Sequence, residues 1–144
     1  MNTKQVIVFR KDLLKGEHAI RKGKFAGQVA HASLGALLKQ FKKMTSEDLP
    51  ELADFYMSYS AQIKKGDILD SWLNGIFTKV VVSVNTEAEL LAIKEAVEEA
   101  GIPCALITDC GKTEFAGVPT NTCLGIGPWI SEEIDKITGT LPLL

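Results

Sequence analysis

The sequence predicts an α/β fold in which helices cover both faces of a mixed four-stranded sheet, and three observations support this. The chain has 144 residues, 46% hydrophobic and 24% charged, which suits a single globular domain over residues 1–144. Strand-like and helix-like segments alternate, as in a sheet that is at least partly parallel. Asp109–Asn121, between the last two strands, is too short for a helical crossover, so these strands are expected to be antiparallel neighbours.

The first half of the chain is expected to form one strand and two helices. Gln5–Arg10 is rich in Val, Ile and Phe and is predicted to be a strand. Lys11–Gly23 is polar and predicted to be a loop. Lys24–Lys43 lacks proline and is rich in Ala, Leu, Gln and Lys, which predicts a long helix. Ser46–Ser60 begins with a capping pattern and has Pro50 early enough for a first turn, so a second helix is predicted there.

The second half is expected to form three strands and two helices. The predicted strands are Phe77–Val84, Cys104–Thr108 and Thr122–Ile126. The clearest local signal is a capping box, Thr86 with Glu89, which opens a helix that Gly101 ends. Ser131 is expected to cap the last helix, because two acidic residues follow it in the first turn.

Composition excludes several classes of protein. No apolar run approaches the ~18 residues of a membrane span, and Val6–Phe9 is too short for a signal-peptide core. Three cysteines without C-x-x-C spacing argue against a disulfide framework. With two histidines, a structural zinc site is not expected. These features predict a soluble, cytoplasmic protein.

Basic residues are concentrated in the first third. The first 43 residues hold ten Lys or Arg and two acids, whereas the remaining 101 hold six Lys or Arg and sixteen acids. Such a region can bind a phosphate-rich ligand by displacing counterions from a nucleic-acid backbone. It can equally be a solvated surface, because the pI of about 5.7 is far below the value above ~9 of dedicated nucleic-acid binders.

Three familiar motifs fail on spacing or context. Gly111-Lys112-Thr113 resembles the end of a phosphate-binding loop, but Leu106 replaces the required earlier glycine and no helix follows. His31–Gly35 resembles a nucleophile elbow but lies inside the predicted helix. The glycines around Gly125 do not form a dinucleotide fingerprint.

A polar stripe runs along the long predicted helix. At about 100° per residue, Lys24, Gln28 and His31 share one narrow line. Gly35 is expected to leave space beside them, and the remaining apolar circumference predicts a well-buried helix. Lysine supplies positive charge, glutamine can orient a carbonyl or water, and histidine can carry a proton. The stripe would also suit the solvent side of an amphipathic helix.

A second candidate segment, Asp109–Thr113, follows a predicted strand. Ligands of α/β sheets bind at strand ends, so Asp109 could position a water or act as a base, and Lys112 could bind phosphate. The segment also has the composition of a simple surface turn.

Together these segments resemble the type 2 peptidyl-tRNA hydrolase family. Gly23–Ala32 matches the family's G-K-x-x-x-Q-x-x-H-A, and Asp109–Thr113 resembles its D-A-G-R/K-T. Trp72 and Gly75 precede a valine-rich strand as in the family, and Thr122–Pro128 resembles its T-V-L-A-I-G-P. The resemblance spans nearly the whole chain.

The resemblance implies a three-layer α/β/α fold with a mixed four-stranded sheet, and hydrolysis of the ester that joins a peptide to the 3′ ribose of tRNA. It implies no metal or nucleotide cofactor, a tRNA partner bound through the basic first third, and a homodimer. The catalytic residues expected on this basis are Lys24, Gln28, His31, Asp109 and Thr113. The residues assigned to substrate or tRNA binding are Arg21, Lys22, Lys39, Lys112 and Thr122.

Ester hydrolysis requires an activated water and a stabilised oxyanion, which suggests roles for these residues. Asp109 or His31 is expected to orient and deprotonate the water. Lys24 would stabilise the oxyanion or hold the terminal phosphate, while Gln28 and Thr113 would position the ester.

Two other classes of function remain open at the sequence level. The chain could be a non-catalytic relative that binds a small molecule or protein in the same cleft. It could also be an interaction module that uses an apolar face of the predicted Ser46–Ser60 helix, formed by Leu49, Leu52, Phe55, Tyr56 and Tyr59. Met44–Ser71 is longer and more acidic than the usual link in the family.

Overall fold

The central sheet has four strands in a mixed arrangement. The computed structural model describes residues 1–44, 47–48 and 59–144. The strands of the sheet are β1 (Thr3–Arg10), β4 (Lys79–Val84), β5 (Cys104–Asp109) and β6 (Thr120–Ile130). They lie in the order β4-β1-β6-β5, with β1 and β4 parallel and the other two pairs antiparallel. The predicted mixed sheet and its antiparallel last pair are confirmed.

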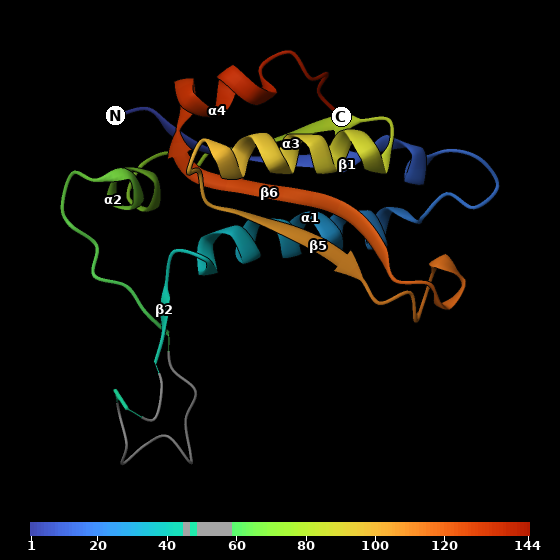
Figure 1. Cartoon of the computed structure of the whole chain (residues 1–144), viewed down its shortest axis with the longest axis horizontal. Helices are drawn as coiled ribbons and strands as arrows, with labels where there is room; N and C mark the ends of the chain where they lie inside the picture. Colours follow the sequence, from blue (N-terminus) through green and yellow to red (C-terminus); the bar gives the residue numbers. More distant parts are fainter. Residues whose placement is uncertain (45–46, 49–58) are drawn as a thin grey trace.

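Helices lie on both sides of this sheet, which gives the expected three layers (Figure 1). The α-helices are α1 (Lys22–Leu38), α2 (Ile68–Leu73), α3 (Glu87–Glu99) and α4 (Ser131–Thr138). A short 3₁₀ turn occupies Lys11–Leu14, and Phe115–Gly117 forms a tight turn with positive φ angles. α1 covers one face of the sheet, and α3 and α4 cover the other. Within the described residues, no helix is long and apolar enough to span a bilayer.

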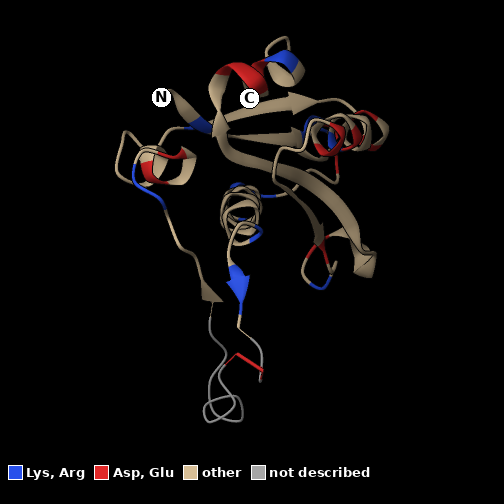
Figure 2. Ribbon diagram, turned by 60° about the vertical axis from the view of Figure 1, so that its left-hand side comes forward, with Lys and Arg blue, Asp and Glu red and all other residues tan. Residues whose placement is uncertain are grey.

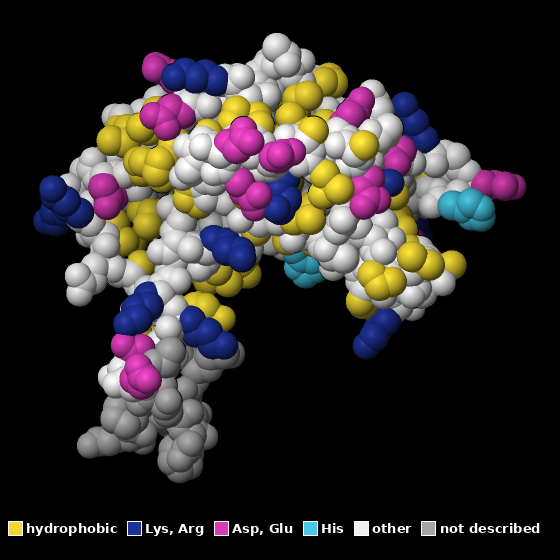
Figure 3. All heavy atoms as spheres, in the orientation of Figure 1, with side chains coloured by type: hydrophobic (Ala, Val, Ile, Leu, Met, Phe, Trp, Pro, Cys, Tyr) yellow, Lys and Arg dark blue, Asp and Glu magenta, His cyan; other side chains and the backbone are white. Residues whose placement is uncertain are grey.

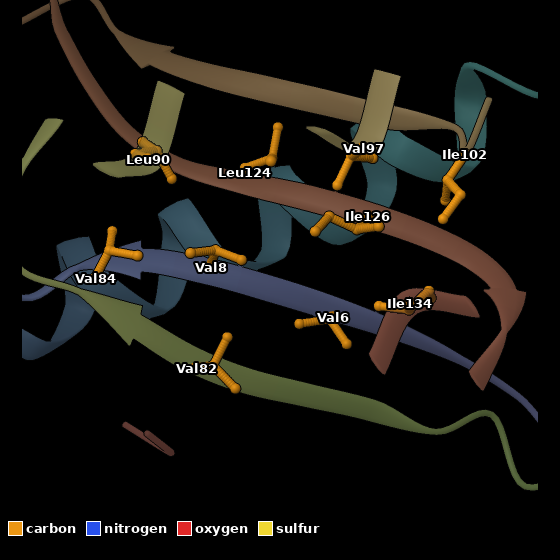
Figure 4. Close-up of a cluster of buried hydrophobic side chains, with 10 residues drawn as sticks. All are labelled: Val6, Val8, Val82, Val84, Leu90, Val97, Ile102, Leu124, Ile126 and Ile134. Atoms are coloured by element: carbon orange, nitrogen blue, oxygen red, sulfur yellow. The ribbon is translucent and has the colours of Figure 1, made fainter. Parts of the chain in front are cut away.

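An apolar core fills the space between the sheet and the α3/α4 layer (Figure 4). Its buried side chains are Val6, Val8, Val82, Val84, Leu90, Val97, Ile102, Leu124, Ile126 and Ile134. The even-numbered residues of β1 point to this face, because successive strand side chains alternate. The predicted capping box starts α3: Glu89 N donates to Thr86 Oγ1 at 3.2 Å, and Thr86 N donates to Glu89 Oε2 at 3.2 Å.

On the other face, two glycines let α1 lie close to β5 and β6. A Cβ atom at Gly125 would overlap the backbone carbonyl of Ala32, so this position requires glycine. A Cβ atom at Gly35 would lie 3.3 Å from the Cβ of Ala105. Gly35 therefore packs against β5, and the expectation that it leaves space beside the polar stripe is wrong.

The predicted long helix differs from α1 in length and burial. α1 begins at Lys22 and ends at Leu38, whereas Lys42–Lys43 form a two-residue strand, β2, that pairs with β3 (Tyr59–Ser60). Its buried residues are Gln28, Ala32 and Ala36, while Leu34 is 57% exposed. The helix packs on the sheet along one side only, so its apolar composition overstated its burial.

Three other expectations about elements need comment. The predicted Ser46–Ser60 helix, with its proposed apolar face, falls mostly outside the described residues, and its last two residues belong to β3 instead. α2 was not predicted; Asp67 caps it by accepting a hydrogen bond from the backbone N–H of Asp70. Ser131 is the first residue of α4 rather than its cap, because β6 continues to Ile130 and passes directly into the helix.

Candidate active site

The two predicted segments meet where the first turn of α1 faces the end of β5. Lys24 Nζ donates to Asp109 Oδ2 at 2.6 Å and to Thr113 Oγ1 at 3.0 Å. The Lys24 and Asp109 side chains are 18% and 9% exposed, so the ion pair is shielded but accessible. An ammonium group has three N–H donors, and one remains for another acceptor. In Figure 2, the acidic end of β5 and the loop after it lie on the α1 side of the sheet.

Gln28 connects this ion pair to the protein interior. Its Nε2 donates to Asp109 Oδ2 at 3.1 Å, and its Oε1 accepts from the hydroxyl of Thr122 at 2.7 Å. Gln28 is 3% exposed and Thr122 is fully buried. A buried amide needs partners for both of its ends, and here a carboxylate and a hydroxyl supply them. The side chain of Gln28 is therefore fixed in one orientation.

A β-bulge turns Thr122 toward α1. The strand register changes from Ile107–Cys123 to Thr108–Asn121, so Thr122 is an extra residue in β6. A bulge interrupts the alternation of side chains and can re-aim one of them. Two adjacent residues of β6 therefore both contact Gln28 of α1. The hydroxyl of Thr122 donates to the side-chain oxygen of Gln28, and Cys123 Sγ donates to the backbone carbonyl of Gln28 at 3.4 Å.

Asp109 is held in its charged form. The hydrogen bond from Lys24 lowers the pKa of Asp109 below its ordinary value, against an opposing effect of burial. The backbone N–H of Gly111 and the amide of Gln28 lower the pKa further. A carboxylate with a lowered pKa is a weak base. Its geometry suits it to holding the Lys24 ammonium charged and correctly aimed.

The loop after β5 has an unusual backbone. Gly111 has φ of 77°, and a Cβ atom there would clash with the backbone of Val118. Phe115 and Ala116 also have positive φ, 65° and 50°. Such conformations persist where surrounding contacts hold them. Hydrogen bonds from Gly117 N to Gly111 O at 3.0 Å and from Val118 N to Phe115 O at 2.9 Å close this loop.

The structure thus gathers Lys24, Gln28, Asp109, Thr113 and Thr122, and it leaves the other predicted site residues apart. His31 is exposed, about 10 Å beyond Lys24 along the helix axis, and its side chain makes no hydrogen bond with any described residue. The four basic residues predicted to bind substrate or tRNA are also exposed: Arg21, Lys22, Lys39 and Lys112. No three His, Cys, Asp or Glu side chains in the described part of the chain are grouped to hold a metal ion.

Sequence reasoning missed two polar side chains that support the site. Gln5 is fully buried in β1, where its Nε2 donates to the backbone carbonyls of Ser33 at 3.0 Å and Gly127 at 3.1 Å. These hydrogen bonds connect α1 to the sheet. The sequence signal that could have identified Gln5 is a single amide side chain in an otherwise apolar strand. Glu114 accepts hydrogen bonds from Arg21, and its neighbours in the sequence gave no signal of this.

The fold and the site together define an α/β protein with a shielded lysine–carboxylate pair at a strand end, an arrangement suited to polarising a carbonyl group. Residues 3–144 match the family model described as peptidyl-tRNA hydrolase PTH2. The chain belongs to this family of enzymes. The family resemblance and the hydrolase class predicted from the motifs are confirmed.

Curated relatives in archaea agree with the family match. A peptidyl-tRNA hydrolase of Methanothermobacter thermautotrophicus is 45% identical over 142 residues, covering 98% of this chain and 99% of the relative. One from Methanopyrus kandleri is 40% identical and covers 98% of this chain and 97% of the relative. A solved structure of a protein of unknown function from Agrobacterium tumefaciens shares the fold, with a TM-score of 0.52, 12% identity, and coverage of 100% of this chain and 98% of that one.

Proposed function

We propose that the chain hydrolyses the ester between a peptide and the 3′ ribose of tRNA, with Lys24 at the centre of the reaction. The observation that supports this most directly is the geometry of the ammonium group. Two of its N–H donors are occupied by Asp109 and Thr113, and the third is available to a carbonyl oxygen. A fixed donor in a partly shielded site stabilises the oxyanion that develops during ester hydrolysis.

In the proposed reaction, water adds to the ester carbonyl carbon and the bond from that carbon to the ribose oxygen breaks. One proton of the water passes to the ribose oxygen, so the products are a peptide carboxylic acid and a tRNA with a free hydroxyl. Lys24 donates to the oxyanion, and Asp109 keeps Lys24 charged. Asp109 Oδ1 accepts one backbone N–H, from Gly111, and has capacity to orient the water as well.

The other gathered residues act on this pair. Thr113 Oγ1 accepts from Lys24, so its own proton remains for the substrate. Gln28 and Thr122 are positioning residues in this proposal, since neither is exposed enough to touch a macromolecular substrate. This replaces the earlier assignment of Thr122 to tRNA binding. His31 is assigned to substrate contact rather than to deprotonation of the water, because about 10 Å of helix separates His31 from Lys24.

The tRNA backbone is proposed to bind along the exposed basic side chains of the first third. The segment Arg21–Lys43 contains six Lys or Arg residues and no acid. Lys22 and Lys39, near opposite ends of α1, make no ion pair with described residues, and neither does Lys112 in the loop after β5. Figure 3 shows Lys and Arg side chains spread over this face of the molecule, several of them with Asp or Glu side chains beside them. Binding should weaken steeply with salt, as counterion release requires.

A homodimer in the cytoplasm is the proposed setting of this activity. A hollow of about 420 Å³ beside α1 has an apolar lining that includes Ala30, Leu34 and Trp72. Leu34 and Phe77 in its lining are 57% and 46% exposed, and in this proposal a second copy of the chain packs on them. Gel filtration with light scattering of wild type and Leu34→Lys tests this: a dimer that persists in the variant argues against this face.

Deacylation of N-acetyl-aminoacyl-tRNA, compared with free aminoacyl-tRNA, tests the function. We expect rapid release of the blocked amino acid and slow release of the free one. Equal rates would indicate a different specificity, and no release above the spontaneous rate would contradict the proposed function. Because pure protein is used without added metal, the same assay with a chelator tests the expectation that no metal is needed.

A further inference from the structure

We propose that Glu114 is a positioning residue that fixes the loop after β5 to the first turn of α1. Its Oε1 accepts from the backbone N–H of Arg21 at 3.4 Å and from Arg21 Nε at 3.3 Å. Glu114 directly follows Thr113, whose hydroxyl meets Lys24. Two adjacent loop residues thus hold two residues at the start of α1. For its effect on turnover, this inference rests on the proposed function.

The start of α1 needs a partner of this kind. Arg21 is the residue before the helix and provides no side-chain cap, and the first turn contains no acid. The first backbone N–H groups of a helix lack partners within the helix, and the helix dipole makes this end positive. Arg21, Lys22 and Lys24 add further positive charge there. A carboxylate from the loop offsets these charges, although it lies 93 positions from Arg21 in the sequence.

The loop, in turn, needs an anchor. Phe115 and Ala116 have positive φ, which side-chain-bearing residues rarely adopt without support from neighbouring contacts. The Glu114 side chain is 17% exposed, and its second oxygen, Oε2, is buried with no hydrogen-bond partner among the described residues. The contacts with Arg21 are therefore the hydrogen bonds that compensate its burial. Without these hydrogen bonds, fewer contacts would hold the loop in the conformation that places Thr113 beside Lys24.

The test combines Glu114→Ala, Glu114→Gln and a control, Glu99→Ala, an exposed residue at the end of α3. With N-acetyl-aminoacyl-tRNA, we expect kcat of E114A to fall about tenfold with KM within about twofold of wild type, because the reacting groups lose alignment while the RNA contacts remain. E114Q keeps an acceptor oxygen for the Arg21 donors but loses the negative charge, so its kcat should lie between those of E114A and wild type. E99A should match wild type.

Hydrogen exchange gives a readout that does not depend on activity. The Gly117 and Val118 amides, which close the loop, should exchange about tenfold faster in E114A, while the Ile7 amide in the centre of the sheet should be unchanged. Wild-type kcat or unchanged loop exchange in E114A would overturn the proposal. So would a rise in KM alone, or an E114Q variant as impaired as E114A. If wild type itself is inactive, the proposed function fails, and the exchange rates still decide the role of Glu114.

Discussion

The two faces of the sheet are built differently. On the α3/α4 face, the ten-residue apolar core comes from three strands, two helices and a connecting segment, and the buried polar side chains of the helices in that layer, Ser131 and Thr138, both belong to α4. On the α1 face, the apolar cluster has five buried members, and three buried polar side chains lie among the contacts between α1 and the sheet: Gln5, Gln28 and Thr122.

This difference indicates that the α3/α4 face contributes mainly to stability, whereas the α1 face positions the proposed reactive groups. An apolar face gains free energy from burial alone and tolerates small changes of shape. A polar face specifies one arrangement, because each buried polar group must keep its partner. Here the bonds from Thr122 to Gln28 and from Gln28 to Asp109 run from the middle of the α1 face to the proposed reactive pair. Changes on this face are therefore expected to alter activity more than stability.

The largest expected effect is loss of the ammonium group itself. Lys24→Ala should reduce turnover of N-acetyl-aminoacyl-tRNA at least ~100-fold, as removal of an oxyanion donor does, and Asp109→Ala should do the same. The matched control is Lys4→Ala, which removes an ion pair of the same 2.6 Å length, to Asp135 of α4 on the other face. K4A should keep wild-type kcat. Near-normal turnover in K24A would remove Lys24 from the mechanism.

A smaller effect is expected from the hydroxyl of Thr122. Thr122→Val preserves shape but leaves Gln28 Oε1 without its donor, so the amide loses its fixed orientation. We expect kcat to fall about tenfold, which corresponds to roughly 1.4 kcal/mol. Thr138→Val in α4 removes another buried hydroxyl, which donates to Ile134 O at 3.1 Å, and should leave kcat unchanged. Equal losses of kcat in T122V and T138V would show that buried hydroxyls on the two faces contribute equally to turnover.

A substitution at Ile126 is expected to lower stability without lowering kcat. Ile126 lies on β6 with Thr122 but belongs to the α3/α4 core. Ile126→Val should lower the free energy of unfolding by about 0.5–1.5 kcal/mol, the usual cost of one buried methylene. Urea denaturation measures this loss, and kcat of the folded variant should match wild type. A drop in kcat without a loss of stability would contradict the division between faces.

The smallest effect concerns acid stability. Since the folded pKa of Asp109 is lowered, mainly by Lys24, its contribution to stability is present above the unfolded pKa of about 3.9 and is lost as pH falls through the folded value. Asp109→Asn lacks this contribution. The difference in unfolding free energy between wild type and D109N should therefore narrow as the pH falls below about 4. Urea denaturation across pH 3–7 checks it, and a difference that stays constant would argue against a stabilised carboxylate.

Local signals in the sequence predicted much of the fold. The Thr86–Glu89 capping box, the valine-rich β4 and the short link before β6 each depend on neighbouring residues, and each was confirmed. The polar spacing of Lys24 and Gln28 likewise placed both on one side of α1. Such features can be predicted because backbone capping and side-chain periodicity act over a few residues.

Tertiary structure decided what these residues do. The bulge that turns Thr122 toward α1, the fit of Gly35 against Ala105 and the bond from Glu114 to Arg21 all join segments far apart in the chain. The sequence by itself predicted the four strands of the sheet and the helices α1, α3 and α4, though not α2, and it showed which residue types are available to the site. Which of them meet, with Lys24 on Asp109 and His31 left in solvent, depended on how α1 is packed on the sheet. Packing distances and strand register are properties of the assembled layers, and no local pattern contains them.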